Sequence, residues 1–427
     1  MSPGPVLAPT AADLVDWDAA VRLSRALVPA GPRVPVATRR ATVALLRRST
    51  VGALPWAGRI TGLRRAARCA AETSEILVVD RAGLMAASAA WLRELMGAVA
   101  APDAGRGART LATAEVSAAL GGLSTRLLGQ VLPPLADDVD DGGSRAGAGA
   151  TVRPGAGESA GPGAGESAGP GAGVQPGARL RARADAAVGT RSGARGRPGA
   201  RLLLVAPNVL EIRQRLELDV IDLPAWIALH EATHLIQLSA APWLAGYLAD
   251  QLRAVVGGLI AAMRSAGAGG PDPYARLARV IALARTADGR SPEPVAALLN
   301  SFLEEPERER LARLAALLTL LEGHAEAVLD AVDPNRMPSV HRLRAVLARR
   351  RRVAGGVGPG PSSGSLLHHA VGTGIKEAQY ADGAAFVRAV VARVGHAGLN
   401  TVWDAPENLP LPGEIVRPDR WIERFGL

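Results

Sequence analysis

Apolar residues recur at helical spacing along most of the chain. In the first such segment, residues 10–28, Leu14, Trp17 and Val21 lie on one side of a helix and charged residues lie on the other. The same spacing, interrupted by prolines and glycines, predicts further helices over residues 36–49, 61–79, 81–99, 112–132, 247–263 and 273–285. The pattern therefore predicts a mainly α-helical protein.

One short run departs from this spacing. Residues Leu202 to Ala206 are consecutive leucine, valine and alanine residues, which favours a small β element before the next helix. We expect this element to be an edge strand. Such a strand could pack against the following helix or bind an extended peptide as an added strand, and both interpretations are open.

Composition divides the chain into three parts. Residues 137–199 are rich in glycine, alanine and proline and contain the repeat PGAGESAG at 154–161 and 162–169. Such a segment buries too little apolar surface to offset the chain entropy lost on folding, so we predict a disordered insertion. It separates a helical N-terminal region, 1–136, from a C-terminal region, 200–427, and we expect these two to pack as one unit.

The run from Leu223 to Leu238 predicts a helix that is buried nearly all round, because few of its residues are polar. Asp222 is its N-cap candidate, and Pro242 limits its other end. The run contains His-Glu-Ala-Thr-His, an HExxH pattern. Histidines four positions apart lie on one helix face, so His230 and His234 could bind the same Zn²⁺.

Glu231, between these histidines, would lie beside the open coordination position of the metal. Zinc lowers the pKa of bound water from 15.7 to about 7, and Glu231 could act as the general base that takes the proton of that water. The alternative is that both histidines are hydrogen-bonded core or surface residues without a metal.

The third ligand of a catalytic zinc must come from elsewhere in the chain. The best candidate is Glu322, which continues the leucine side of a predicted helix, whereas Arg310 and Arg313 mark its polar side. A carboxylate buried among leucines needs a positive partner, and zinc is such a partner. Gly323 would permit close approach of another backbone. An ordinary solvated helix face is the alternative for Glu322.

Three further side chains are candidates near this metal. Glu326, one turn after Glu322, could accept the N–H of a metal-binding histidine and fix the tautomer of its ring. His324 is a rival ligand, but it points about 200° away from Glu322 around the helix. For the oxyanion formed in hydrolysis, Tyr380 is a candidate donor beside His324 and His341, and a structural role stays open for each.

These segments resemble an actinobacterial family of zincin-like metallopeptidases that are labelled hydrolases, one branch of which is named for deazaflavin coenzyme biosynthesis. The resemblance covers residues 200–427 well and 1–140 weakly. Position 324 is His where Tyr is familiar in the family, and position 326 is Glu where many members have Asp. The motifs that carry the resemblance are residues 202–208, 229–234, 242–244, 321–326 and a tail signature that includes Tyr380, Asn400, Trp403, Asn408 and Glu414.

The resemblance implies a mainly helical zincin-like fold with one Zn²⁺ held by the two histidines and Glu322. We therefore expect a zinc metallopeptidase that hydrolyses a peptide or related amide bond in a peptide or protein substrate. One rival hypothesis is a non-catalytic zinc-binding scaffold or partner protein linked to deazaflavin coenzyme biosynthesis, although structural zinc would not require Glu231. A second rival is a helical interaction protein without metal.

The charge, the length of the apolar runs and the cysteine content limit which partners and which cellular location we expect. The net charge of +9 and the pI near 10.9 do not come with basic residues clustered beside aromatic ones, so we expect neither a nucleic-acid nor a membrane partner. No apolar run approaches the roughly 18 residues that a membrane helix needs, and no signal peptide is apparent, so we expect a cytoplasmic protein. Cys69 is the only cysteine, which excludes an internal disulfide and a thiolate metal cluster, and we expect it to be buried. The sequence does not indicate an oligomeric state.

Overall fold

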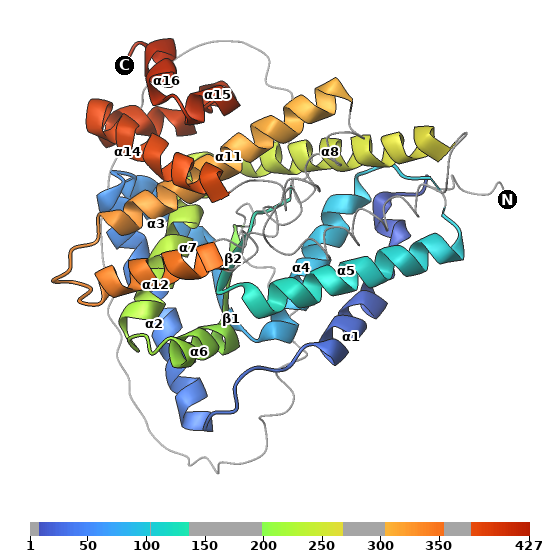
Figure 1. Ribbon diagram of the computed structural model, residues 1–427, viewed down its shortest axis with the longest axis horizontal. Helices are drawn as coiled ribbons and strands as arrows, with labels where there is room; N and C mark the ends of the chain where they lie inside the picture. The colour runs from blue at the N-terminus through green and yellow to red at the C-terminus, as the bar shows by residue number, and fades with distance from the viewer. Residues whose placement is uncertain (1–7, 103, 136–198, 268–303, 354–376) are drawn as a thin grey trace, which may run out of the picture. The chain divides into compact units, whose positions relative to one another are not determined.

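A computed structural model describes residues 8–102, 104–135, 199–267, 304–353 and 377–427 (Figure 1). The parts of 1–138 and 198–427 that it describes belong to one compact unit. The predicted insertion, apart from residue 199, and the predicted helix over 273–285 lie outside the described residues. The described fold is mainly helical with a small sheet, as the apolar spacing predicts.

Five helices form the N-terminal part of the fold. The segment 10–28 is a short 3₁₀ turn, η1 (Ala11–Leu14), followed by α1, because the Asp16 side chain accepts the backbone N–H of Ala19 and starts a new helix there. The five helices are α1 (Trp17–Leu27), α2 (Val36–Ile60), α3 (Arg64–Thr73), α4 (Arg81–Gly97) and α5 (Arg106–Arg126).

Two helices end earlier in the structure than the sequence predicts. The segment 61–79 ends its helix at Thr73 and continues as strand β1 (Glu75–Val79), and the segment 112–132 ends its helix at Arg126 and continues as β2 (Gly129–Leu132). Short β-branched runs such as Ile-Leu-Val-Val favour a strand once a neighbouring strand supplies hydrogen-bond partners. Here that neighbour is β3 (Arg201–Val205).

Strand β3 is central rather than at the edge, so the prediction of an edge strand was wrong. The order of the three-stranded sheet is β1-β3-β2, with β1 parallel and β2 antiparallel to β3. Leu202 and Leu204 pack into one hydrophobic core, whereas Leu203 and Val205 pack into another. A strand that is apolar on both faces is typical of the middle of a covered sheet, and the uninterrupted apolar run carried that signal.

The C-terminal part adds further helices, of which α7 packs against strand β2 of the sheet. Helix α7 packs against α2, α3, β2 and α11, and α11 also packs against α8 and α14. The helices are α6 (Ala206–Arg215), α7 (Asp222–Ala240), α8 (Leu244–Gly267), α11 (Glu305–Asp330), α12 (Val340–Val353), α14 (Glu377–Asn400), α15 (Pro412–Ile415) and α16 (Pro418–Phe425), with 3₁₀ turns η3 (Thr401–Trp403) and η4 (Pro406–Asn408) between α14 and α15.

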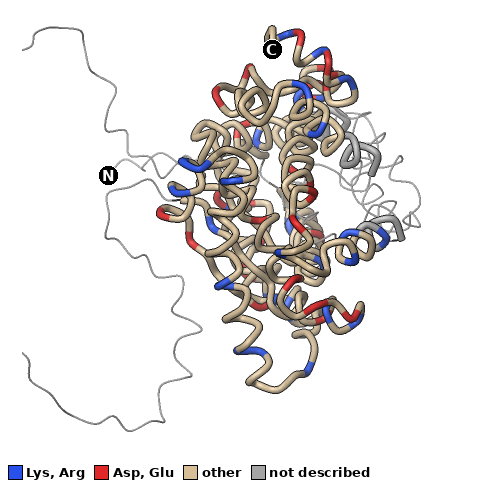
Figure 2. Tube along the Cα trace, turned by 90° about the vertical axis from the view of Figure 1, so that its left-hand side faces the viewer, with Lys and Arg blue, Asp and Glu red and all other residues tan. Residues whose placement is uncertain are grey.

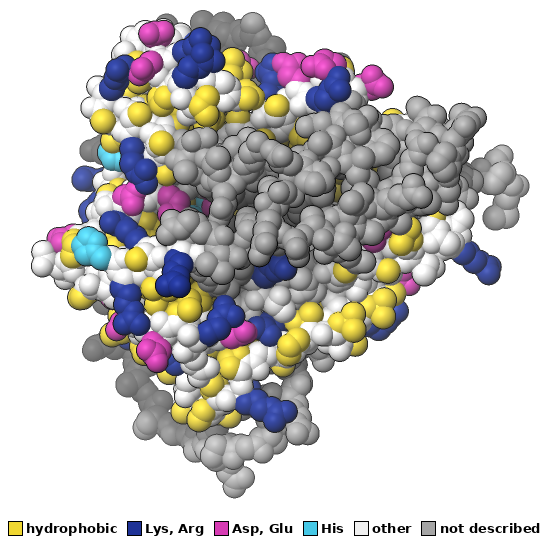
Figure 3. All heavy atoms as spheres, in the orientation of Figure 1, with side chains coloured by type: hydrophobic (Ala, Val, Ile, Leu, Met, Phe, Trp, Pro, Cys, Tyr) yellow, Lys and Arg dark blue, Asp and Glu magenta, His cyan; other side chains and the backbone are white. Residues whose placement is uncertain are grey.

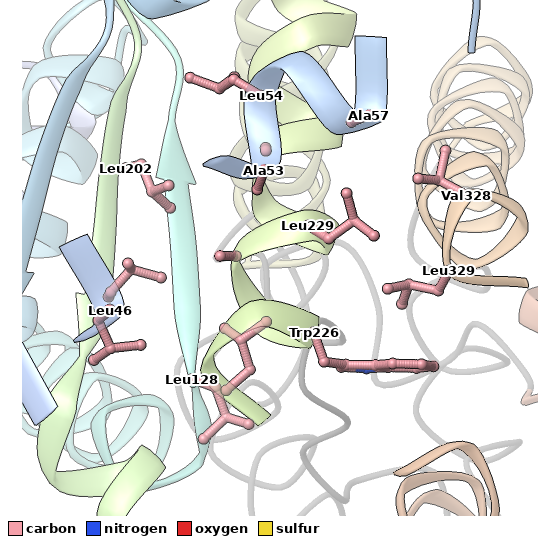
Figure 4. Packing of buried hydrophobic residues seen from close by; sticks show 14 of the residues in the cluster. Leu46, Ala53, Leu54, Ala57, Leu128, Leu202, Trp226, Leu229, Val328 and Leu329 are labelled. Atoms are coloured by element: carbon pink, nitrogen blue, oxygen red, sulfur yellow. The ribbon is translucent and has the colours of Figure 1, made fainter. Parts of the chain in front are cut away.

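Helix α7 is buried nearly all round and ends before Pro242, as predicted. Figure 4 shows Leu229 of this helix between Leu202 of β3 and Leu329 of α11. The N-cap prediction was wrong, because Asp219 rather than Asp222 accepts the first backbone N–H groups. The Asp222 carboxylate instead accepts hydrogen bonds from the backbone and hydroxyl of Ser339.

Asn208, in the motif at residues 202–208, ties three elements together. Its amide donates to the carbonyl oxygens of Ser124 and Leu127, at the end of α5, and its oxygen accepts from Nε of the buried Arg81. Arg81 also pairs with Glu211 on α6. Because Leu127 lies two residues before β2, these bonds fix where β2 starts.

The described surface mixes charges of both signs. Basic and acidic positions are interspersed along the chain trace (Figure 2), and side chains of both charges are scattered among hydrophobic ones over the visible part of the face in Figure 3. Among the described helices, none combines the length and apolar character that a membrane crossing requires. Cys69 is exposed on α3, so the expectation that it is buried was wrong.

Candidate metal centre

Helix α7 places His230 and His234 one above the other on one face. Their Nε2 atoms are 3.0 Å apart, and their rings meet edge to face with centroids separated by 4.8 Å. The His230 side chain is fully buried and that of His234 is 14% exposed. The spacing of four residues therefore brings two imidazole nitrogens to one point.

Helix α11 brings Glu322 to the same point. One carboxylate oxygen, Oε2, lies 3.4 Å from Nε2 of His230, and the other, Oε1, lies 3.6 Å from Nε2 of His234. The Glu322 side chain is 6% exposed. Residues 235–321 separate it from the second histidine along the chain, so the packing of α11 on α7 is what creates this group.

Close packing of α11 on α14 contributes to this placement. A Cβ atom at Gly323 would lie 2.2 Å from the carbonyl carbon of Gly383, and a Cβ atom at Gly383 would lie 2.2 Å from the carbonyl oxygen of Thr319. The two helices therefore cross backbone against backbone at paired glycines. The predicted close approach at Gly323 is confirmed, and it occurs at the residue next to Glu322.

The three side chains fit a divalent cation such as zinc. Their donor atoms all lie within 4.8 Å of one another, and no other group of three potential metal ligands was found in the described part of the chain. Metal–ligand distances of about 2.0–2.1 Å in a tetrahedron correspond to ligand–ligand distances of about 3.3 Å. The observed separations, 3.0, 3.4 and 3.6 Å, bracket that value.

The protonation of the free site also suits a cation. Burial lowers the pKa of His234 below its usual 6.5, and the opposing effect of the Glu322 charge does not overcome it. A neutral imidazole keeps a lone pair on one ring nitrogen, which is the form that binds a metal. Nitrogen and carboxylate oxygen together are a common donor set for catalytic zinc.

Glu231 is buried beside these ligands, with 3% of its surface exposed. Burial, and after it the charge of Glu322, raise the pKa of Glu231 well above its usual 4.5. A carboxylate with a raised pKa is a stronger base, which suits a group that accepts a proton from water.

Gly129 of β2 makes room for Glu231. A Cβ atom at this position would lie 2.5 Å from both Oε1 and Cδ of Glu231. Gly129 is not among the site residues predicted from the sequence. A glycine inside a strand is the signal that could have found it, because such glycines often mark a close approach by another group.

Gln237 contacts His234, one of the two histidines that Glu326 was predicted to hold. The oxygen of Gln237 lies 2.9 Å from Nδ1 of His234, while its amide nitrogen donates to the carbonyl of Leu321 at 2.9 Å and lies 3.1 Å from Nδ1 of His324. Glu326 is half-buried one turn after Glu322, and its role in fixing a histidine tautomer stays a prediction.

His324 is buried behind the ligands rather than among them. Its ring lies 5.5 Å from that of Trp403, centroid to centroid, and its exposed fraction is zero. Burial, and then the charges of His396 and His234, lower its pKa to about 3. The carbonyl of Trp403 accepts the indole N–H of Trp243, so the tail and the segment after α7 are joined behind His324.

Two oxyanion candidates remain, His341 and Tyr380. His341 is exposed on α12. Tyr380 belongs to the first turn of α14, and its side chain lies outside the described residues. The candidacy of Tyr380 as an oxyanion donor therefore stays a prediction.

A pocket adjoins the metal centre and is largely apolar. It encloses about 520 Å³ of empty space, part of which is open to solvent, and Glu231, His234 and Glu322 line it. Gly129, Gln130 and Val131 form its β2 side. The other lining residues are Pro133, Gln237 and five leucines, Leu238, Leu244, Leu248, Leu318 and Leu321.

A helical fold with HExxH and a downstream glutamate at one centre is the arrangement expected of a zincin-like protein. The model of the zincin-like metallopeptidase family matches residues 15–422. The chain therefore belongs to the zincin-like metallopeptidase family.

A solved structure shares the fold. It is from Chloroflexus aurantiacus and is described as "a putative hydrolase with a novel fold"; the TM-score is 0.55 over 96% of this chain and 99% of that chain, at 22% sequence identity. At this identity the likeness concerns the fold alone. A comparison with curated proteins gives no match.

Proposed function

We propose that this protein is a zinc-dependent hydrolase that cleaves a peptide or related amide bond. In this proposal His230, His234 and Glu322 bind zinc, and Glu231 is the general base. The observation that carries the proposal is the convergence of the three ligand side chains at separations of 3.0 to 3.6 Å, with a buried carboxylate of raised pKa beside them.

Zinc bound at this centre would supply Lewis-acid chemistry, by polarising the scissile carbonyl and making water more acidic. Glu231 takes a proton from the water whose oxygen attacks the carbonyl carbon. The carbon–nitrogen bond then breaks, and the same proton passes from Glu231 to the leaving amine. The Glu231 side chain extends from α7 toward Gly129 of β2, where solvent has little access to its carboxyl group.

The pocket supports a substrate with a large apolar group. Its five leucines come from α7, α8 and α11, and the charged groups on its wall are those of the metal centre. Burying a leucine-sized side chain there would contribute about 1.5–3 kcal/mol to binding. We therefore infer a peptide or protein substrate with an aliphatic residue next to the scissile bond.

The test compares the wild type with Glu231→Gln on a peptide library, with zinc content measured for both. The amide keeps the size of the side chain but cannot accept the proton, so we expect cleavage to fall by about 10²–10⁴-fold while bound zinc stays the same. Equal, background-level cleavage by both proteins with zinc retained would favour the scaffold hypothesis, including a partner role in deazaflavin coenzyme biosynthesis.

A further inference from the structure

We propose that Gln237 is a positioning residue, whose amide group holds His234 in the Nδ1–H tautomer and joins the two ligand-bearing helices α7 and α11. This inference rests on the proposed function, because it assumes that Nε2 of His234 binds a metal. It assigns to a neutral amide a task that carboxylates and backbone carbonyls commonly perform in zinc sites.

The orientation of the Gln237 amide follows from one fixed partner. The carbonyl oxygen of Leu321, 2.9 Å from the amide nitrogen, can only accept a hydrogen bond, so the NH₂ end of Gln237 must face it. The oxygen of Gln237 therefore faces Nδ1 of His234 at 2.9 Å. Because that oxygen can only accept, Nδ1 of His234 carries the proton, and the lone pair lies on Nε2.

The second amide hydrogen has a partner of its own. It points to Nδ1 of His324 at 3.1 Å, and Nδ1 must accept because Gln237 nitrogen has no lone pair to offer. His324 therefore carries its proton on Nε2. Gln237 is 1% exposed and His324 is fully buried, so losing these bonds would leave buried polar groups unpaired, which is unfavourable.

The contacts of Gln237 on α11 flank the third ligand. Leu321 precedes Glu322 directly and His324 follows it by two residues, so one side chain of α7 bonds on both sides of Glu322. These bonds fix how α11 lies along α7, and thereby where the carboxylate meets the histidines. A glutamate at position 237 could accept from His234 but could not donate to Leu321, which explains why an amide suits this position.

The experiment reads the tautomers directly. Two-bond ¹H–¹⁵N correlations of the histidine rings are recorded on the metal-free full-length chain labelled with ¹⁵N-histidine, for the wild type, Gln237→Met and Gln237→Glu. We expect His234 of the wild type to carry its proton on Nδ1 and His324 to carry its proton on Nε2. Gln237→Met should lose the Nδ1–H form of His234, whereas Gln237→Glu, which still accepts, should retain it.

Zinc affinity, measured by competition with a chelator, is the second readout. We expect Gln237→Met to weaken zinc binding by about 10–100-fold and Gln237→Glu to restore most of it. Thr50→Val is the matched control, because it removes a buried hydrogen bond to the carbonyl of Leu46 in α2, away from the centre. This control should bind zinc like the wild type.

The outcomes separate the two proposals. A wild type with His234 protonated on Nε2, or a folded Gln237→Met with unchanged zinc affinity, would overturn the role of Gln237, whatever the enzyme does. The tautomer of His234 is measured on the wild type alone. The inference can therefore still be refuted if the Gln237→Met protein fails to fold. A wild type that binds no zinc would instead remove the proposed function.

Discussion

Helices α7 and α11 each carry buried acidic side chains into the same centre, but they do so by different means. The groups on α7 lie within five consecutive residues, so local helix geometry alone brings His230, Glu231 and His234 together. Glu322 on α11 reaches them through tertiary packing, through the glycine crossing with α14 and the hydrogen bonds of Gln237. A candidate metal site can thus combine a local half that spacing encodes with a distant half that depends on the whole fold.

The largest expected effect comes from the distant half. In Gly323→Ala the new Cβ would meet only backbone atoms of α14, at 2.2 to 2.5 Å, so the helices must separate. We expect the free energy of unfolding to fall by about 3 kcal/mol, and zinc binding to weaken because Glu322 moves with the helix. Chemical denaturation and zinc titration measure both effects.

Gly52→Ala is the matched control for that variant. Gly52 is exposed in the middle of α2, and a Cβ atom there meets nothing within 4 Å. We expect it to stabilise the protein by up to about 1 kcal/mol. If Gly323→Ala were as stable as Gly52→Ala and bound zinc equally well, the dependence of α11 on the glycine crossing would be wrong.

A smaller effect is expected where strand β2 meets the local half. In Gly129→Ala the new Cβ collides with the carboxyl end of Glu231, which can move without unfolding the protein. A catalytic group displaced by about 1 Å loses on the order of 100-fold in rate, so we expect that decrease in cleavage of the peptide that the wild type cleaves best. Zinc affinity should stay within about threefold, because the ligands are untouched. Unchanged cleavage would show that Glu231 does not depend on this contact.

The last expected effect appears only below neutral pH and concerns His324 and the stability of the metal-free protein. Burial, followed by the charges of His396 and His234, lowers its pKa from 6.5 to about 3, so between these values the unfolded chain binds one more proton than the folded chain. The stability that neutral His324 confers is therefore full above pH 6.5 and is lost as the pH falls, by about 1.4 kcal/mol per pH unit.

The measurement compares the free energy of unfolding of the wild type and His324→Phe, both with chelator present, from pH 7 to pH 4. We expect the difference between the two proteins to shrink steadily as the pH falls, since the phenylalanine variant lacks the titrating group. A difference that stays constant over this range would mean that His324 takes up a proton as readily in the folded protein as in the unfolded chain.

The sequence predicted the residues of the candidate centre better than the fold around it. HExxH, the burial of α7 and the choice of Glu322 followed from spacing and from the leucines that surround that acid. Strands β1 and β2 were missed because each is only four or five residues long and follows a helix closely. The apolar pattern of such a short run is compatible with either a helix or a strand. Which strands pair is decided by contacts distant in sequence.

The roles of Gly129 and Gln237 could not be predicted from the spacing of residues along the chain. Each is an ordinary residue in its own segment, and its importance arises only from a neighbour that the fold brings close, Glu231 in one case and Leu321 with His324 in the other. Glu326 was assigned the task of holding a histidine because a carboxylate is the usual partner. The structure places the amide of Gln237 against His234.

X-ray absorption at the zinc edge, on the full-length protein loaded with zinc and analysed for metal content, tests the central claim most directly. We predict one zinc per chain, with two histidine nitrogens and the carboxylate of Glu322 at about 2.0–2.2 Å, and with the imidazole count falling to one in His230→Ala. Less than half an equivalent of zinc, or a coordination shell that does not change in His230→Ala, would contradict the account.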